Sequence, residues 1–294
     1  MQPSLFQPAS LGATGKRCRQ GALWLAVAIG LVALQAAASA TEAALTLTTG
    51  DDTRQFTVEQ LLAHDALSEV TVPKVPGYET QMTLKAIPAL TLFKGMRLSD
   101  FDTIEAQATD GYVSQLPTSL LEAANDGGSV AWIAVEPPDA PWPNLPDRDY
   151  SAGPLYLVWT NPEASDVSAA QWPYALASLT GVASPAQRWP QIAVVGDLAA
   201  DAPERAGYAS FVKNCLACHK IAGGGEAEIG PDLARPMSPT DYMTEDGLRK
   251  LIRDPASVRT WPDQAMTGFD EEDLSDRDIE NIIAYLRHMA GRSR

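Results

Sequence analysis

The sequence predicts two domains of different kinds, a β-rich α+β domain over residues 41–200 followed by an all-α domain over residues 201–294. Three observations predict this division. Short β-branched and aromatic segments alternate with Pro, Gly, Asn and Asp upstream of residue 197. Apolar residues follow a helical period downstream of residue 203. The composition changes between these points, and 294 residues are enough for two domains.

The first 40 residues have the pattern of a secretory signal peptide. Lys16, Arg17 and Arg19 precede a nearly continuous apolar stretch, and Ala38-Ser39-Ala40 is a small-residue cleavage motif. We therefore expect an exported, periplasmic protein whose mature chain begins at Thr41. The alternative is an uncleaved N-terminal membrane anchor, because the apolar stretch approaches the length that spans a bilayer.

The net charge of the chain limits its partners. The formal charge is -15, and removal of the three basic leader residues moves it to -18. We therefore expect neither nucleic acid nor an anionic membrane surface as a partner. Loss of Cys18 with the leader leaves Cys215 and Cys218, and no disulfide is expected.

Strands are expected in the first domain at residues 130–135 and 155–159, which are runs of apolar and β-branched residues. Trp142 lies in a Pro-rich stretch, and we expect this side chain to be exposed for contact with a partner.

Three helices are expected in the second domain. The first opens at Asp201, which is followed by Glu204 in a capping-box pattern. Another begins at about Thr244 and ends before Pro255. The last begins at Ser275, shows an i, i+3, i+4, i+7 apolar pattern and should stop at Gly291.

The most informative motif is Cys215-Leu216-Ala217-Cys218-His219. The spacing C-x-x-C-H is the one at which proteins attach haem through two thioethers, with the histidine as an iron ligand. A thioredoxin-like redox pair would need a βαβ context, and a zinc site would need further ligands at suitable spacing. The sequence shows neither context.

Residues 203–291 resemble a class I c-type cytochrome. The resemblance rests on this motif together with Gly207-Tyr208, Phe211, Gly230-Pro231-Asp232-Leu233, Asp254-Pro255, Met266 and Ile283-Ala284-Tyr285-Leu286. It implies one covalent haem c, a crossing of the first and last helices at Gly207, and a Pro231 carbonyl that accepts a hydrogen bond from His219 Nδ1. His219 and Met266 would then be the iron ligands.

Other residues compete with Met266 for the sixth coordination position. The candidates are Met237, Met243, Met289 and His288. Met266 lies between a Pro-bounded loop and the final helix, where the resemblance places the axial thioether. No catalytic residue is expected, because two protein ligands leave no open position on iron.

Residues 45–195 resemble the molybdopterin-binding domain of the sulfite oxidase family. The similar stretches, in order along the chain, are residues 56–62, 95–101, 108–112 and 153–158. Residues 41–200 contain no cysteine to bind molybdenum, and they hold seven basic against 20 acidic residues. We therefore expect no molybdopterin, and a fold of this kind that serves docking or scaffolding.

The predicted function is that of a periplasmic monohaem cytochrome that passes single electrons between redox proteins. Residues 270–280 contain seven acidic residues, which favours partners with a basic docking face. The same run could simply be the solvated start of a helix. Two other functions stay open: a cytochrome-fused molybdenum sulfite-dehydrogenase-like oxidoreductase or its cytochrome subunit, and a haem sensor or peroxidase.

Overall fold

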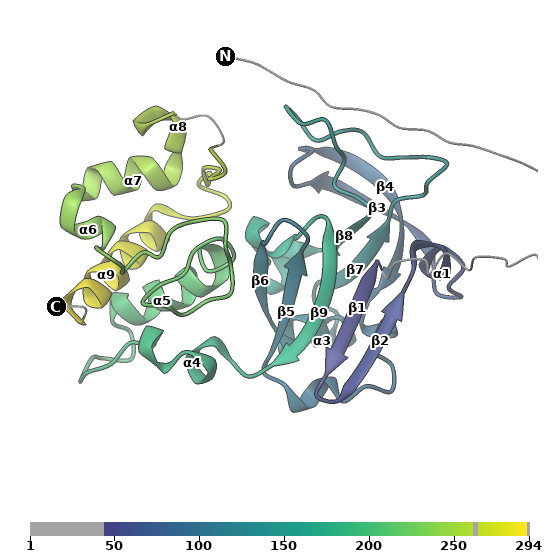
Figure 1. Ribbon diagram of the computed structural model, residues 1–294, viewed down its shortest axis with the longest axis horizontal. Helices are drawn as coiled ribbons and strands as arrows, with labels where there is room; N and C mark the ends of the chain where they lie inside the picture. The colour runs from purple at the N-terminus through teal and green to yellow at the C-terminus, as the bar shows by residue number, and fades with distance from the viewer. Residues whose placement is uncertain (1–43, 261–263, 293–294) are drawn as a thin grey trace, which may run out of the picture. The chain divides into compact units, whose positions relative to one another are not determined.

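The computed structural model describes residues 44–260 and 264–292, and the predicted signal peptide lies outside the described residues. The described chain is β-rich up to residue 182 and helical from residue 203 (Figure 1). None of the helices within these ranges is long and apolar enough to cross a bilayer.

The β-rich part contains a five-stranded sheet in the order β2–β1–β9–β5–β6. The β1–β9 pair is parallel, and the other neighbouring pairs are antiparallel. Side chains of β1 alternate between buried and half-buried, as expected for a strand with one face on a core. The strands are β1 (Leu45–Thr49), β2 (Asp52–Phe56), β5 (Thr103–Ala108), β6 (Val113–Pro117) and β9 (Leu176–Val182).

A second sheet has four antiparallel strands in the order β3–β4–β7–β8. One hydrophobic cluster contains buried residues of both sheets, among them Leu47, Leu179, Ile133 and Leu157. The strands are β3 (Ser68–Val75), β4 (Thr80–Pro88), β7 (Val130–Val135) and β8 (Leu155–Thr160). The two strands expected from sequence are therefore confirmed.

Trp142 is buried rather than exposed, with 9% of its surface accessible. Its backbone N–H donates to Glu136 Oε1 at 2.6 Å, and its ring joins the core of the β-rich part. The expectation of an exposed contact residue was wrong, because the ring packs into the hydrophobic core although its neighbours in the Pro-rich stretch are exposed.

Short helices and 3-10 turns connect or follow the strands, and helices of 4 to 17 residues build the second part. The connecting helices are α1 (Val58–Leu62), α2 (Ala89–Leu92), α3 (Thr118–Glu122) and α4 (Pro185–Arg188), with the 3-10 turns η1 (Leu98–Asp100), η2 (Ala123–Asp126), η3 (Pro162–Ser165), η4 (Ala169–Gln171) and η5 (Pro190–Ile192). The later helices are α5 (Pro203–Asn214), α6 (Pro239–Tyr242), α7 (Glu245–Arg253), α8 (Pro255–Val258) and α9 (Asp276–Arg292).

Two helix starts follow the sequence, whereas one start and one end do not. Thr244 and Ser275 accept hydrogen bonds from the N–H groups of Gly247 and Asp278, as N-caps do. Asp201 does not cap α5, whose N-cap is Ala202 without a side-chain bond. Pro203 at the first helical position has no N–H that would need a cap. Gly291 does not end α9, which continues to Arg292.

The segment between β9 and α5 packs onto the helical core. Ile192 is fully buried among the helices, and its carbonyl accepts a 2.7 Å hydrogen bond from the Tyr285 hydroxyl. Arg188 lies 4.1 Å from the centroid of the Trp189 ring. The predicted domain boundary at residue 200 stays a prediction, but residues on its N-terminal side already belong to the helical core.

Helices α5 and α9 cross in close contact at Gly207. A Cβ atom there would lie 1.9 Å from the carbonyl oxygen of Asn281 and 2.9 Å from Tyr285 Cβ. One turn further along α5, the ring of Phe211 packs 5.3 Å from that of Tyr285, centroid to centroid. The expected helix crossing is therefore present, and only glycine fits at its centre.

Gly207→Ala should lower the free energy of unfolding by about 2 to 3 kcal/mol, because the added methyl meets backbone that cannot rotate away. A shift of the urea midpoint would measure this loss. Gly291→Ala is the matched control in the other helix, since no neighbour lies within 4 Å of its Cβ position. The control should be neutral or stabilising by up to about 1 kcal/mol, and equal losses in both variants would contradict the assigned role of Gly207.

Candidate metal centre

Cys215, Cys218 and His219 lie on one turn that directly follows α5. The N–H of Cys215 donates to Phe211 O at 2.8 Å and so continues the helix by one residue. The N–H groups of Cys218 and His219 then both donate to Cys215 O, at 3.1 and 2.9 Å. This turn is compact enough to present both thiols and the imidazole to one ligand.

The turn is attached to both parts of the described chain. Leu216 and Ala217 are each 1% exposed, so the residues between the cysteines anchor the turn by burial. The carbonyl of Ala217 accepts a 3.0 Å hydrogen bond from the N–H of Val113, the first residue of β6. The turn is therefore hydrogen-bonded directly to β6, an edge strand of the five-stranded sheet.

The His219 ring is held from one side by residues 230–231. Its Nδ1 lies 2.9 Å from Pro231 O, and the N–H of Gly230 donates to Cys218 O at 2.7 Å. A Cβ on Gly230 would come within 2.5 Å of the ring, so this loop packs directly against the imidazole. Burial lowers the pKa of His219, against the opposing effect of the Pro231 hydrogen bond. A neutral ring with Nδ1 engaged leaves Nε2 as a metal ligand.

Asp232 fixes the loop that carries Pro231. One carboxylate oxygen accepts from the N–H groups of Ala222, Ala234 and Arg235 at 2.8 to 3.1 Å. The other accepts from the Gly223 N–H at 2.7 Å. The sequence alone predicts no separate role for Asp232. Asp is common in turns of every kind, so the sequence did not indicate that this carboxylate accepts hydrogen bonds from four backbone N–H groups.

Both cysteines are free thiols, and burial is the main cause of their altered acidity. Burial raises the pKa of Cys215 to about 12, with a further contribution from Cys218. Burial and Asp110 raise the pKa of Cys218 to about 11. Raised pKa values of this kind differ from those of redox-active cysteines, whose pKa is lowered.

The described residues do not favour a site built from several ionisable ligands. No group of three or more His, Cys, Asp or Glu side chains in the described ranges could hold a metal ion. Two thiols and one oriented imidazole fit a haem instead, because the thiols would attach the macrocycle covalently and the imidazole would bind its iron.

The four methionines and His288 differ in their surroundings. Met289 is 1% exposed in the helical core, whereas Met237 is 51% exposed. Met243 is half-buried against the same core, and His288 Nε2 accepts a 3.4 Å hydrogen bond from the Val195 N–H. Packing and hydrogen bonding thus account for Met289 and His288 without a metal. Met266 is half-buried and lies in a segment without regular secondary structure before α9.

The segment after Met266 is anchored to α7. The N–H of Phe269 donates to Ile252 O at 3.2 Å. The guanidinium of Arg253 donates to the carbonyls of Phe269 and Leu274, both at 2.8 Å. Met266 is therefore followed by a fixed segment, although its role as an iron ligand stays a prediction.

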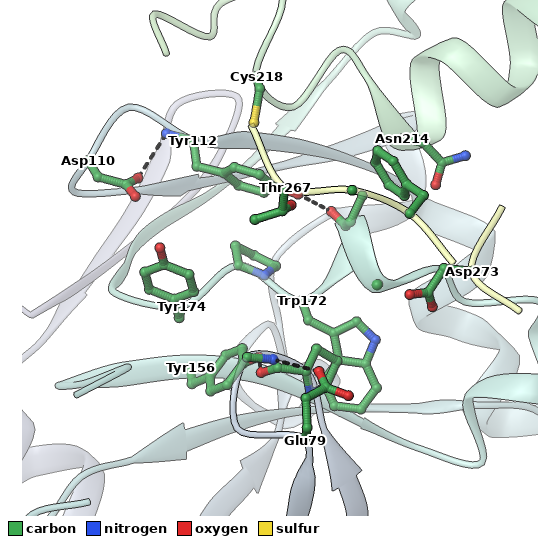
Figure 2. A pocket seen from close by; sticks show the side chains of 17 residues that line it. Glu79, Asp110, Tyr112, Tyr156, Trp172, Tyr174, Asn214, Cys218, Thr267 and Asp273 are labelled. Carbon is green, nitrogen blue, oxygen red and sulfur yellow. Dashed lines mark hydrogen bonds between the residues drawn. The ribbon is translucent and has the colours of Figure 1, made fainter. Parts of the chain in front are cut away.

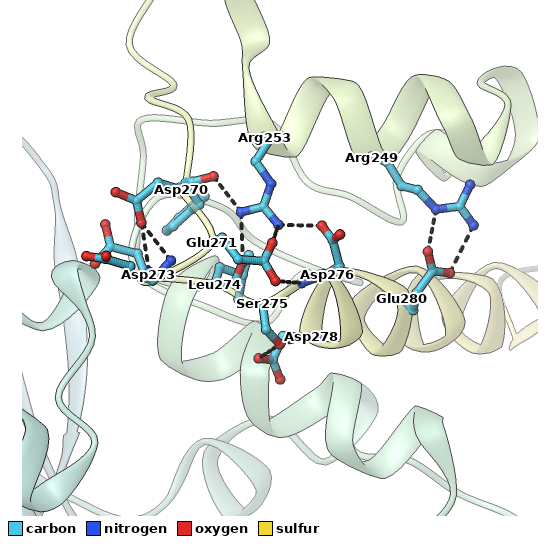
Figure 3. A network of polar contacts seen from close by, with 12 residues as sticks. Arg249, Arg253, Asp270, Glu271, Asp273, Leu274, Ser275, Asp276, Asp278 and Glu280 are labelled. Carbon is cyan, nitrogen blue, oxygen red and sulfur yellow. Dashed lines mark hydrogen bonds and ion pairs between the residues drawn. The ribbon is translucent and has the colours of Figure 1, made fainter.

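The acidic run at residues 270–280 forms an ordered network (Figure 3). Arg253 pairs with Glu271 at 3.0 Å and with Asp276 at 2.7 Å. Arg249 pairs with Glu280. Asp270 accepts the N–H groups of Glu272 and Asp273 at 3.0 and 2.9 Å. Much of the run therefore stabilises the start of α9 and the loop before it.

Comparison with known proteins identifies the helical part. A family model for Cytochrome c matches residues 204–290, which span the described turn, the Pro231 loop and α9. The search of the curated proteins gives no match. The resemblance of residues 45–195 to the sulfite oxidase family stays a prediction. Residues 204–290 form a cytochrome c domain, and this family implies covalently bound haem c and electron transfer.

Proposed function

We propose that this protein is an exported, periplasmic cytochrome that carries a single haem c and passes single electrons between redox proteins. The observation that carries the proposal is the turn at residues 215–219, in which two free thiols accompany an imidazole oriented by Pro231. Bound haem supplies one-electron iron chemistry, and the described side chains supply attachment and orientation.

Each residue of the proposed site has a separate task. Cys215 and Cys218 bind the two vinyl groups, and His219 Nε2 binds iron while Pro231 O holds Nδ1. Met266 is proposed as the opposite ligand, because its segment is anchored by Arg253 and because Met289 is fully packed elsewhere. A thioether opposite an imidazole raises the potential and leaves no position for substrate, which favours electron transfer over catalysis.

The β-rich part is proposed to act in docking or scaffolding. Residues 41–200 contain no cysteine, and their excess of acidic residues does not suit a pterin phosphate. This part also contacts the cytochrome domain through two ion pairs, of Asp166 with Lys213 at 2.7 Å and of Arg188 with Glu226 at 2.9 Å. The β-rich part is therefore held against the domain that carries the proposed haem site, and we propose no metal chemistry for it.

Attachment of haem is the direct test of this function. The mature protein should show one covalent haem on a haem-stained denaturing gel, together with one iron and no molybdenum by elemental analysis. Cys215→Ala or Cys218→Ala should leave one thioether or none, and the double variant should lose covalent haem completely. Undiminished staining in the double variant would refute the site, and stoichiometric molybdenum would favour the sulfite-dehydrogenase-like alternative.

Met266→Ala should abolish the weak near-infrared sulfur-to-ferric charge-transfer band. It should also lower the reduction potential on the order of 0.1 V, because axial ligands move haem potentials over about 0.8 V. Optical spectroscopy of the ferric protein and a redox titration measure both effects. Met243→Ala and Met237→Ala are the matched controls, and loss of the band in either of them would move the ligand to that residue.

We further propose that the redox partner has a basic docking face. The formal charge of -15 supports this, and the exposed Glu272 lies in a loop of which Phe269 and Asp273 line the same cavity as Cys218. Glu271 and Asp276 support it less, because each of them already pairs with Arg253.

The second-order rate of reduction or oxidation by the partner should fall several-fold as salt rises from low values to about 0.15 M, where the Debye length is about 8 Å. Glu272→Lys should slow the reaction at low salt only. Glu163→Lys, which makes the same charge change on the β-rich part, is the control in stopped-flow measurements. A rate that is independent of salt and unchanged in Glu272→Lys would reject electrostatic docking at this loop.

A further inference from the structure

The hairpin formed by β5 and β6 connects the β-rich part to the haem-attachment turn. The N–H of Val113, the first residue of β6, donates to Ala217 O at 3.0 Å. Gly111, at the tip of the hairpin, faces the loop that follows the turn, since a Cβ atom on it would lie 3.9 Å from Glu228 Cβ. The tip of the hairpin therefore contacts two segments of the cytochrome domain.

The contact belongs to a sheet edge that is covered by its surroundings. β6 is an edge strand of the five-stranded sheet, and it contacts both α5 and η4. Ser114 of β6 is fully buried, and Gln115 is 3% exposed. The hydroxyls of Tyr112 and Ser114 both donate to Ala170 O, at 2.6 and 3.1 Å. These contacts fix the hairpin against the turn, and they leave little of this edge open to another strand.

The carboxylate of Asp110 is held in a defined place at the tip. Its Oδ1 accepts a 3.0 Å hydrogen bond from the N–H of Tyr112, and the N–H of Ala108 donates to Tyr112 O at 2.9 Å. Gly111 has a φ of 91°, which glycine adopts without strain. Asp110 is exposed, and it forms no ion pair with a Lys or Arg of the described residues. Its negative charge is therefore fixed in position and not neutralised by a partner.

Asp110 lies at the wall of the haem site. Figure 2 shows Asp110 and Tyr112 on the side of a cavity that the Cys218 thiol also faces. Thr267, which follows Met266, lines the same cavity, so this cavity belongs to the haem site. The β-rich part thus contributes a fixed carboxylate to the surroundings of the proposed iron centre.

We propose that the β-rich part adjusts the iron centre of the cytochrome domain: Asp110 lowers its reduction potential, and Val113 is a positioning residue that holds the turn against the hairpin. This inference rests on the proposed function. Ferric haem carries one more positive charge than ferrous haem, so a nearby carboxylate stabilises the ferric state. Because solvent screens an exposed charge, the effect should be several-fold in the redox equilibrium rather than many powers of ten.

A redox titration of the full, haem-loaded Asp110→Asn variant tests the tuning role. Asn removes the charge and keeps an oxygen that can accept the Tyr112 N–H. We expect the ferrous-to-ferric ratio at a fixed potential to rise about threefold, which is about 28 mV at 59 mV per tenfold change for one electron. Asp110→Glu keeps the charge and should leave the potential unchanged. An unchanged potential in Asp110→Asn would overturn the tuning role.

Asp126→Asn is the matched control. It makes the same charge change in η2, which packs on α3 and β7 instead of on the turn. Equal shifts in the two Asn variants would show a general effect of net charge and reject the assignment to Asp110. The shift in Asp110→Asn should also shrink between about 0.01 M and 1 M salt, where the Debye length falls from about 30 to 3 Å. A shift independent of salt would indicate a rearranged hairpin and would equally overturn the proposal.

Hydrogen exchange of the Val113 amide in the haem-loaded protein tests the positioning role. We expect exchange at least about a hundredfold slower than in an unstructured peptide, because the N–H is bonded to Ala217 O. Faster exchange would show that the hairpin does not hold the turn. All of these measurements start from protein with covalent haem. Their failure would leave the proposed electron transfer untouched, whereas absence of covalent haem would refute the proposed function itself.

Discussion

The position of the turn at residues 215–219 is the constraint on which the rest of the structure depends. It is set from three directions: by the end of α5 through the Phe211 carbonyl, by the loop at Gly230 that packs on the imidazole, and by β6 through the Val113 N–H. A thioether-bound ligand tolerates little rotation of such a turn, because two covalent bonds and one metal bond would have to form from five consecutive residues.

The packing of the helices transmits that constraint through the cytochrome domain. Gly207 allows α5 to approach α9 closely, and the same α9 residue, Tyr285, contacts Phe211 and hydrogen-bonds to Ile192. The segment that leads from the β-rich part is thereby attached to the helical core. A change at the helix crossing would consequently move both the turn and the connection to the sheets. For this reason Gly207, which belongs to no binding site, should not tolerate an added methyl group.

Much of the helical part could be predicted from the sequence because its signals are local or specific. The C-x-x-C-H spacing, the Thr244 and Ser275 caps and the apolar period of α9 each depend on neighbours along the chain. The four-donor role of Asp232 and the burial of Trp142 depend on chain segments brought together by folding, so composition gave no indication of them. Gly291 resembled a helix stop, yet α9 extends one residue further, to Arg292, because glycine can also occupy a helical position.

The acidic run shows how a charge pattern can have two physical meanings at once. Seven acidic residues in sequence suggested an exposed patch, but Arg253 pairs with two of them and also bonds the carbonyls of Phe269 and Leu274. Exposed ion pairs contribute little stability individually. The hydrogen bonds from Arg253 to the two carbonyls contribute more than the ion pairs to the local structure, since they fix the segment that follows Met266. Asp273 follows in the same loop and lines a cavity together with Asp110 from the β-rich part. One loop thus combines carboxylates that pair with Arg253 and a carboxylate that faces the β-rich part.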